Sequence, residues 1–487
     1  MKKSSIFILS AWMLALCLLF ASCGKATNDP DQTSPPDPAP SVPEDPTVPK
    51  DPTVPKDPTI PENPPEDPTI DPVDPPVDPP IDPPKPPIDP SVDLPALKTD
   101  TPTIHIYTED GCEIPTDKSE VNCTVYLQSV LTDQCANDLT ATIRCRGNGS
   151  MTVGKRTGKF PYKLKFQEKI NVFDLGDGKE KDWVLLAHVG DQTLLRNYAA
   201  KLMGDLLTGI PYSPNARLVN VYLNGDYIGV YELCEQVEVK NNRIDIDDSL
   251  TGPENGFLVE LDNYASRPYV RINGQKYGIK SEVLSDEQVT FIEEYLNEVY
   301  NAIVEGDQTT LEELVDMNSL VDMYLLQEFA KNIDAGWSSF FMYREAGGKL
   351  IFAPPWDFDL SLGNDARLDN GSYEDLYIGT GRPGFMQNHE WYNMLYSENE
   401  WFQDMAAARW REITGTVVPA VIRGVRDAAD AIAEDMERNF TVWDFLGEKQ
   451  QQEPRAVWEL TTYEAHIDYL IKWMENRKAW LDNEFSA

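Results

Sequence analysis

The stretch that decides the fold runs from Asn332 to Asn364 and reads NIDAGWSSFFMYREAGGKLIFAPPWDFDLSLGN. Its two apolar runs flank a Glu-Ala-Gly-Gly segment, and this pattern predicts a β-hairpin. One aspartate, Asp334, precedes the first strand, and two others, Asp357 and Asp359, follow the second. Because a hairpin brings its two ends together, we expect the three carboxylates to converge on one cleft.

The spacing of the aspartates predicts their roles. Asp357 and Asp359 are two residues apart, so extended backbone would turn both to one side and Trp356 and Phe358 to the other. Two carboxylates on one side favour a cation between them, and hard oxygen ligands suit Mg²⁺ or Mn²⁺. Asp334 is then placed to accept a proton from a hydroxyl, an arrangement that phosphoryl transfer requires. Spacing alone leaves open an Asp-rich surface loop, or a structural calcium site built from Asn364, Asp365 and Asp369.

From Asn332 onward the segment resembles the catalytic core of the CotH kinase family, spore-coat-type atypical kinases distantly related to protein kinases. That family uses an N-x-D element as its catalytic loop and a W-D-x-D element in place of the kinase D-F-G. The resemblance implies that Asp334 is the catalytic base and that Asp357, with Asp359 beside it, holds the metal ion. The family often has an asparagine as a further metal ligand five residues after the catalytic aspartate. This chain has Ser339 there, a weaker neutral ligand.

The N-terminus has the pattern of a targeting segment. Two lysines precede an apolar run that ends in Ala21-Ser22-Cys23, similar to a bacterial lipobox. We therefore expect residues 1–23 to be a lipoprotein signal peptide, with Cys23 as the lipidated N-terminus after cleavage. An ordinary signal peptide and an uncleaved anchor are the alternatives, although the run is short for a membrane span.

Residues 24–95 form a proline- and aspartate-rich linker. Between Asp29 and Pro95 lie 26 of the chain's 38 prolines, with sixteen acidic residues against three lysines. Proline lacks an amide donor and fixes φ, so neither a helix nor a sheet is expected here. The composition predicts a polyproline-like stalk of ~200 Å when fully extended.

The remainder, residues 96–487, is strongly acidic. Removing the stalk's −13 and the +3 of Lys2, Lys3 and Lys25 from the chain's −39 leaves −29. This charge argues against nucleic acid as a partner and is compatible with a basic protein. The five cysteines in this part fit no zinc spacing, and we interpret them as half-buried strand residues with room for one disulfide.

Residues 96–280 read as a β-rich lobe. The Asn224-Gly225 pair predicts a tight hairpin between two of its strands. One helix is expected from Leu194 to Leu207. The strands expected here are 103–107, 122–128, 139–146, 162–167, 184–186, 216–223, 227–239 and 256–262.

Three elements of this lobe are suited to hold a nucleotide. The first is the glycine-bearing turn 146–150 (RGNGS), whose backbone amides and Asn148 are candidate phosphate contacts. The second is the strand YKLKF, in which Lys163 and Lys165 share a face. The third is the segment 191–197 (DQTLLRN), which carries Arg196 near a helix start. A plain turn and a solvated strand face give the same first two patterns.

These elements also resemble the CotH kinase family, which has an R-G-N-S-like turn, a Y-x-x-K strand, a D-x-T-L-L-R-N helix and an N-G-x-Y-x-G-x-Y hairpin. The resemblance implies that Lys165 contacts the phosphates of ATP. Lys159 and Arg196 are secondary candidates for the same role.

Residues 281–487 read as a mainly helical lobe that carries the hairpin 332–364, with expected strands at 338–344 and 349–354. Ser285 to Gln288 forms a capping-box start for one helix, and a second helix, Asn318 to Lys331, leads directly to Asp334. Tryptophans recur through the tail, and their helical spacing favours core packing over a sugar-binding platform. The tryptophans singled out are Trp401, Trp410, Trp458, Trp473 and Trp480.

The whole pattern predicts an α+β, two-lobed, atypical protein-kinase-like head on an acidic stalk, anchored by lipid to a bacterial membrane outside the cytoplasm. The implied reaction is transfer of the ATP γ-phosphate to Ser or Thr of a protein, with Mg²⁺ or Mn²⁺. Because compartments outside the inner membrane hold little ATP, two non-catalytic alternatives stay open. One is a surface adhesion protein, and the other is a structural pseudokinase.

Overall fold

The computed structural model describes residues 94–130, 135–249, 252, 254–380 and 389–486. Contacts divide the chain into Met1–Ile81 and Asp82–Ala487, and every described residue belongs to the second unit. The predicted signal peptide, Cys23 and nearly all of the predicted stalk lie outside the described residues.

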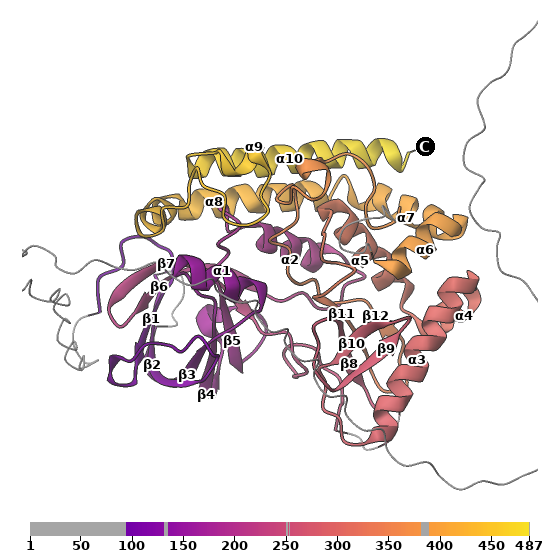
Figure 1. The fold of residues 1–487 in the computed structure, drawn as a ribbon, viewed down its shortest axis with the longest axis horizontal. Helices are drawn as coiled ribbons and strands as arrows, with labels where there is room; N and C mark the ends of the chain where they lie inside the picture. Colours follow the sequence, from indigo (N-terminus) through magenta and orange to yellow (C-terminus); the bar gives the residue numbers. More distant parts are fainter. Residues whose placement is uncertain (1–93, 131–134, 250–251, 253, 381–388, 487) are drawn as a thin grey trace, which may run out of the picture. The chain divides into compact units, whose positions relative to one another are not determined.

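The N-terminal half of this unit is built around a closed seven-stranded barrel with the order β1-β2-β3-β4-β5-β7-β6 (Figure 1). Strand β6 closes the barrel by pairing parallel to β1, and the other pairs are antiparallel. Successive side chains of a strand point to opposite faces, so every second residue of β4 faces the core, and Tyr162, Leu164 and Phe166 are buried there. The strands are β1 (Thr103–Thr108), β2 (Val121–Gln128), β3 (Ala136–Cys145), β4 (Tyr162–Ile170), β5 (Glu180–Leu186), β6 (Ala216–Leu223) and β7 (Asp226–Glu235).

Two helices belong to the connections of the barrel. α1 (Gly149–Thr157) follows β3, and α2 (Arg196–Leu206) follows β5. Short 3-10 segments also lie in connections of the chain, at η1 (Glu109–Gly111), η2 (Val172–Asp174) and η3 (Asp369–Gly371).

A second, five-stranded sheet has the order β12-β11-β8-β10-β9. Strand β8 pairs antiparallel with both β10 and β11, so the hairpin strand β11 is added to strands from earlier in the chain. The strands are β8 (Phe257–Leu261), β9 (Tyr269–Ile272), β10 (Gln275–Ile279), β11 (Phe340–Arg344) and β12 (Leu350–Ile351).

Helices dominate the C-terminal part. α8 is amphipathic, and its buried residues contact β7 of the barrel as well as α2 and α10, which lies beside it (Figure 1). Within the described part, no helix is both long and apolar enough to cross a membrane. The helices are α3 (Asp286–Glu305), α4 (Gln308–Leu314), α5 (Met317–Ala330), α6 (Glu390–Glu398), α7 (Glu400–Ile413), α8 (Val417–Val442), α9 (Arg455–Trp458) and α10 (Tyr463–Glu484).

These elements confirm the predicted α+β class, with a β-rich N-terminal part and a helical C-terminal part. The Asn224-Gly225 hairpin and the Ser285–Gln288 capping box form as expected. The tail tryptophans Trp410 and Trp473 are buried in the core, as the helical spacing predicted. The boundary between lobes at residue 280 stays a prediction, although β8, β9 and β10 belong to the sheet of β11 rather than to the barrel.

Three local expectations differ from the structure. The five described cysteines are all free, so the expected disulfide is absent among them. The glycine-bearing turn continues into α1, which begins at Gly149. Strand β12 ends at Ile351 rather than at Pro354. The Phe352 amide donates to the Ser319 hydroxyl at 3.0 Å instead of to a strand, and Pro354 and Pro355 have no amide hydrogen with which to continue the pairing.

Candidate active site

A cavity of about 850 Å³ lies between the barrel and the second sheet. The barrel side contributes residues of the β3–α1 connection, the start of β4 and the β5–α2 connection. The other side contributes the end of β8, the loop after α5 and the loop after β12. Side chains from distant parts of the sequence therefore face one space.

The three predicted aspartates line this cavity together. Burial raises the pKa of Asp334 to about 7, helped by the nearby charge of Asp357, while the Arg367 guanidinium acts in the opposite direction. Burial also raises the pKa of Asp359 well above its ordinary value, with Asp357 and Asp334 adding to the effect. The three carboxylates are thus within electrostatic reach of one another, as the hairpin predicted.

The backbone at Asp357 is not extended, so the expected geometry is wrong in this detail. Its φ is 66°, in the left-handed region that non-glycine residues seldom adopt. Trp356 also lines the cavity instead of turning away from it, whereas Phe358 is buried as expected. The segment after Pro354 and Pro355 is a loop rather than a strand, so side chains two residues apart need not point to the same side.

Two polar side chains contact the aspartates, and one of them, Asn332, joins Asp334 to Asp357. The Asn332 Oδ1 accepts from the Asp334 amide at 3.2 Å, and the Asn332 Nδ2 donates to the Asp357 carbonyl at 3.5 Å. The Ser339 hydroxyl donates to the Asp357 Oδ2 at 3.1 Å. Ser339, the residue in place of the family's asparagine, therefore lies directly beside the predicted metal ligand.

The opposite wall of the cavity carries positive charge. Arg146 lies with its guanidinium 5.7 Å from the centroid of the Trp356 ring, and its side chain makes no hydrogen bond or ion pair with other described residues. Burial lowers the pKa of Arg146, while Asp357 and Glu260 oppose that shift. Sequence reasoning quoted this arginine only as part of the RGNGS turn. Its position immediately before the glycine, where β3 leads into α1, is the sequence feature that could have marked it as a cavity-lining residue.

Of the two candidate lysines on β4, Lys163 lines the cavity and forms an ion pair with Asp182 at 2.7 Å. Lys165 is exposed and is not among the residues that line the cavity. The two share a strand face but lie ~7 Å apart, at ~3.3 Å per residue. The role of Lys165 as a phosphate contact stays a prediction, and the geometry favours Lys163.

Lys159 and Arg196 do not line the cavity either. The Lys159 ammonium donates to the Val230 carbonyl at 2.9 Å and lies 5.0 Å from the centroid of the Tyr231 ring, and burial lowers its pKa to about 7. Arg196 is buried in an ion pair with Asp191 at 2.5 Å. Both side chains lie outside the cavity and contact protein partners, so neither is used in the function proposed below.

Asn148 lines the cavity at the start of α1, where its Oδ1 accepts from the Lys118 ammonium at 3.1 Å. Arg367 lines it near Asp334 and is held by the Asp365 carboxylate, with Nε to Oδ1 at 2.9 Å and Nη2 to Oδ2 at 2.5 Å. Sequence reasoning assigned Arg367 no role, because nothing local marks which arginine after the acidic loop turns inward.

The calcium alternative is not favoured by these contacts. Asp365 is bound by Arg367, and the Asn364 Nδ2 donates to the Gly190 and Asp359 carbonyls, both at 2.8 Å. Among the described residues, no group of three or more His, Cys, Asp or Glu side chains is gathered as a metal site. Mg²⁺ typically takes one or two carboxylates together with water and phosphate oxygens, and Asp357 and Asp359 supply hard oxygen donors of that kind. Burial raises the pKa of Asp359, repulsion by Asp357 and Asp334 adds to the rise, and a cation between these groups would relieve that repulsion.

A search of curated proteins returns no match for this chain. A family model described as CotH kinase protein matches residues 143–481, which include the cavity-lining residues from Arg144 to Gln451. Such kinases generally use ATP and a divalent metal ion. Because the match covers most of the chain and includes both walls of the cavity, the chain belongs to the CotH kinase family.

Proposed function

We propose that this protein transfers the γ-phosphate of ATP to a Ser or Thr hydroxyl of a protein substrate, with Mg²⁺ or Mn²⁺. The observation that carries the proposal is the opposition of charges across one cavity. Asp334, Asp357 and Asp359 line one side, and Arg146 and Lys163 line the other. Phosphoryl transfer needs positive groups on the phosphates, carboxylates for the cation and a base at the acceptor.

Each side chain then has one task. Asp334 accepts the proton of the acceptor hydroxyl, and its pKa of about 7 is suited to a general base near neutral pH. Asp357 and Asp359 would hold the divalent ion, which when bound neutralises charge on the phosphates. Arg146 and Lys163 would contact phosphate oxygens from the barrel side. In this proposal the barrel acts as the nucleotide-holding lobe of a two-lobed kinase.

The proposal includes a location outside the cytoplasm. The Ala21-Ser22-Cys23 sequence after an apolar run supports lipidation of Cys23, and the proline-rich segment supports a stalk between the lipid and the kinase part. Cys23→Ser is expected to release the protein from the membrane fraction or to stall its processing. Unchanged membrane association together with unchanged fatty-acid labelling would show that the lipoprotein assignment is wrong.

The direct test is incubation of the purified protein with labelled ATP, Mn²⁺ and a basic acceptor protein. We expect label on Ser or Thr of the acceptor, and no label when EDTA removes the metal. Binding of ATP without transfer to any acceptor would favour the pseudokinase alternative. Absence of metal-dependent ATP binding would favour a non-catalytic adhesion or binding protein instead.

A further inference from the structure

The segment from His188 to Asn197 binds the loop that carries Asp357 and Asp359. Its part 191–197 is the one considered above for nucleotide binding. The Asn197 Oδ1 accepts from the Phe358 amide at 2.7 Å, between the two aspartates. The Arg196 Nε donates to the Leu362 carbonyl at 3.4 Å, and the Asn364 Nδ2 donates to the Gly190 carbonyl at 2.8 Å. These three bonds tie one short segment to the whole acidic loop.

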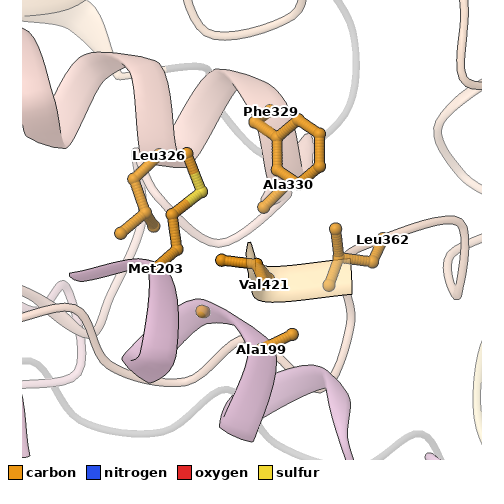
Figure 2. A pocket seen from close by; sticks show the side chains of 8 residues that line it. Ala199, Met203, Leu326, Phe329, Ala330, Leu362 and Val421 are labelled. Atoms are coloured by element: carbon orange, nitrogen blue, oxygen red, sulfur yellow. The ribbon is translucent and has the colours of Figure 1, made fainter. Parts of the chain in front are cut away.

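Apolar packing seats the far end of the same loop. Figure 2 shows Leu362 facing a small cavity of about 10 Å³ that is also lined by residues of α2, α5 and α8. The Leu362 amide additionally donates to the Ala330 carbonyl at 2.8 Å. The loop is therefore anchored by the core at Leu362 and at the buried Phe358 ring, and Asn197 binds the Phe358 amide.

Asn197 is itself held in one orientation by a buried polar chain. The Phe358 amide can only donate, so the Asn197 oxygen must face it and the Asn197 Nδ2 faces the His188 Nδ1 at 3.4 Å. His188 Nδ1 then accepts, and the protonated Nε2 donates to the Glu232 carboxylate at 2.5 Å. The other oxygen of Glu232 accepts from the Lys201 ammonium at 3.0 Å. All four side chains in this hydrogen-bonded series are buried.

The loop needs such support because its backbone is strained at the metal ligand. Asp357 adopts φ 66°, and a non-glycine residue in that region persists only where neighbouring contacts enforce it. Asn197 binds the amide that directly follows this residue, and Asn332 binds the carbonyl of Asp357 itself. Loss of the Asn197 contact would let the backbone at Asp357 relax and turn its carboxylate away.

We propose that Asn197 is a positioning residue for the divalent cation, and that it acts by holding the Asp357–Asp359 loop through the Phe358 amide. The inference rests on the proposed function for the identity of the cation. The hydrogen bonds by which residues 188–197 hold the acidic loop, here called the clamp, do not depend on that function. Side chains that orient metal ligands typically change metal affinity or activity by about 10- to 100-fold when they are removed.

Asn197→Leu is therefore expected to raise the Mn²⁺ concentration that half-saturates ATP binding by about 10- to 100-fold, as measured by calorimetry. Hydrogen exchange of the Phe358 amide should become about tenfold faster in the metal-free protein. Asn197→Asp, which keeps an acceptor for that amide, should restore most of the protection. If Asn197→Leu does not fold, Asn197→Ala, which also removes the acceptor of the Phe358 amide, takes its place with the same expectations.

The matched control is Asn439→Leu. Asn439 is also a buried asparagine, and its Oδ1 accepts from the Val230 amide at 3.0 Å, on the α8 side of the barrel. The Asn439→Leu variant should lose about as much thermal stability as Asn197→Leu and leave the half-saturating Mn²⁺ concentration unchanged. Equal changes of that concentration in the Asn197 and Asn439 variants would overturn the proposal, because both losses would then be merely structural.

Failure of the proposed function gives a different result. If the wild-type protein binds no ATP at any Mn²⁺ concentration, the kinase proposal and the cation role of Asn197 are both wrong. The exchange experiment still decides the clamp in that case. Unchanged exchange of the Phe358 amide in Asn197→Leu overturns the clamp, and faster exchange confined to residues 356–364 supports it.

Discussion

The two walls of the cavity are built in different ways. The cations of the barrel wall lie on or next to regular elements, with Lys163 within β4 and Arg146 immediately after β3. The carboxylates of the other wall lie on loops, where Asp357 has a left-handed backbone. In a strand the backbone hydrogen bonds already fix where the side chains lie, whereas the acidic loop depends on buried asparagine side chains for its shape. Changes to the supports should therefore affect cation binding more than phosphate binding.

The largest effect is expected from changes to Asp334 and Asp357, to which we assign different roles. Asp334→Asn should lower phosphate transfer by ~10²–10⁴-fold while ATP·Mg²⁺ binding stays nearly intact, because the side chain only accepts the acceptor proton. Asp357→Asn should weaken metal-dependent ATP binding by at least ~10-fold, because it removes a charge that the cation requires. Calorimetry beside a transfer assay measures both, and equal loss of binding in the two variants would contradict the division.

A smaller effect is expected on the basic wall. Arg146→Met keeps an apolar contact with Trp356 but removes the charge, and it should weaken ATP binding by roughly 10- to 100-fold, the value of a charged hydrogen bond. Lys165→Met, on the same barrel but outside the cavity, should change that affinity little. A larger loss in the Lys165 variant would restore the role that the family resemblance implied for it.

A buried histidine behind β11 should make the fold sensitive to acid. His389 packs against Phe340 of β11, with ring centroids 4.2 Å apart, and burial lowers its pKa from 6.5 to about 3. Below pH 6.5 His389 is protonated in the unfolded chain but stays neutral in the folded protein, so its contribution to the free energy of unfolding falls as the pH falls. The raised pKa values of Asp334 and Asp359 act in the opposite direction. The share of His389 in this loss is about 1.4 kcal/mol for each pH unit down to about pH 3.

Urea unfolding at pH 7.5 and pH 5.5 measures this loss, and His389→Leu should remove the share of His389. His466, whose pKa burial lowers to about 4, would still contribute to the remaining acid sensitivity. An unchanged difference between the two pH values in His389→Leu would show that His389 is not responsible.

Short-range patterns in the sequence predicted the elements well. Alternation in the YKLKF strand, the Asn224-Gly225 turn and the Ser285 cap each depend on neighbours within a few residues. Period-two alternation puts Lys163 and Lys165 on one face, but which of them reaches the cavity depends on where the neighbouring connections lie.

Contacts between distant segments were beyond these patterns. Nothing in either segment indicates that β8 would pair with β11. The DQTLLRN motif shows which side chains are polar, but not that Arg196 and Asn197 would bind the backbone of the acidic loop. The left-handed backbone of Asp357 is likewise set by its partners rather than by its own residue type.

The smallest effect is expected at Ser339, where the acidic wall departs from its family. Ser339 has φ 63°, and asparagine adopts this region several-fold more readily than most residues. Ser339→Asn would also present a carbonyl oxygen where the hydroxyl now donates to the Asp357 carboxylate. We expect the half-saturating Mn²⁺ concentration to fall by about 2- to 5-fold, ~0.5–1 kcal/mol, with the metal-free melting temperature unchanged or slightly higher.

The neighbouring residue supplies the control for this last prediction. Ser338 also lines the cavity but is not among the residues with positive φ, so Ser338→Asn should leave the half-saturating Mn²⁺ concentration as it is. A fall of equal size in both variants would mean that any added amide near the aspartates attracts the cation. A fall only in Ser339→Asn would instead show that the acidic wall keeps the family's ligand position and that serine has merely weakened it. That outcome would favour a working kinase with reduced cation affinity over a pseudokinase, because a degenerate cleft gains nothing from one restored ligand.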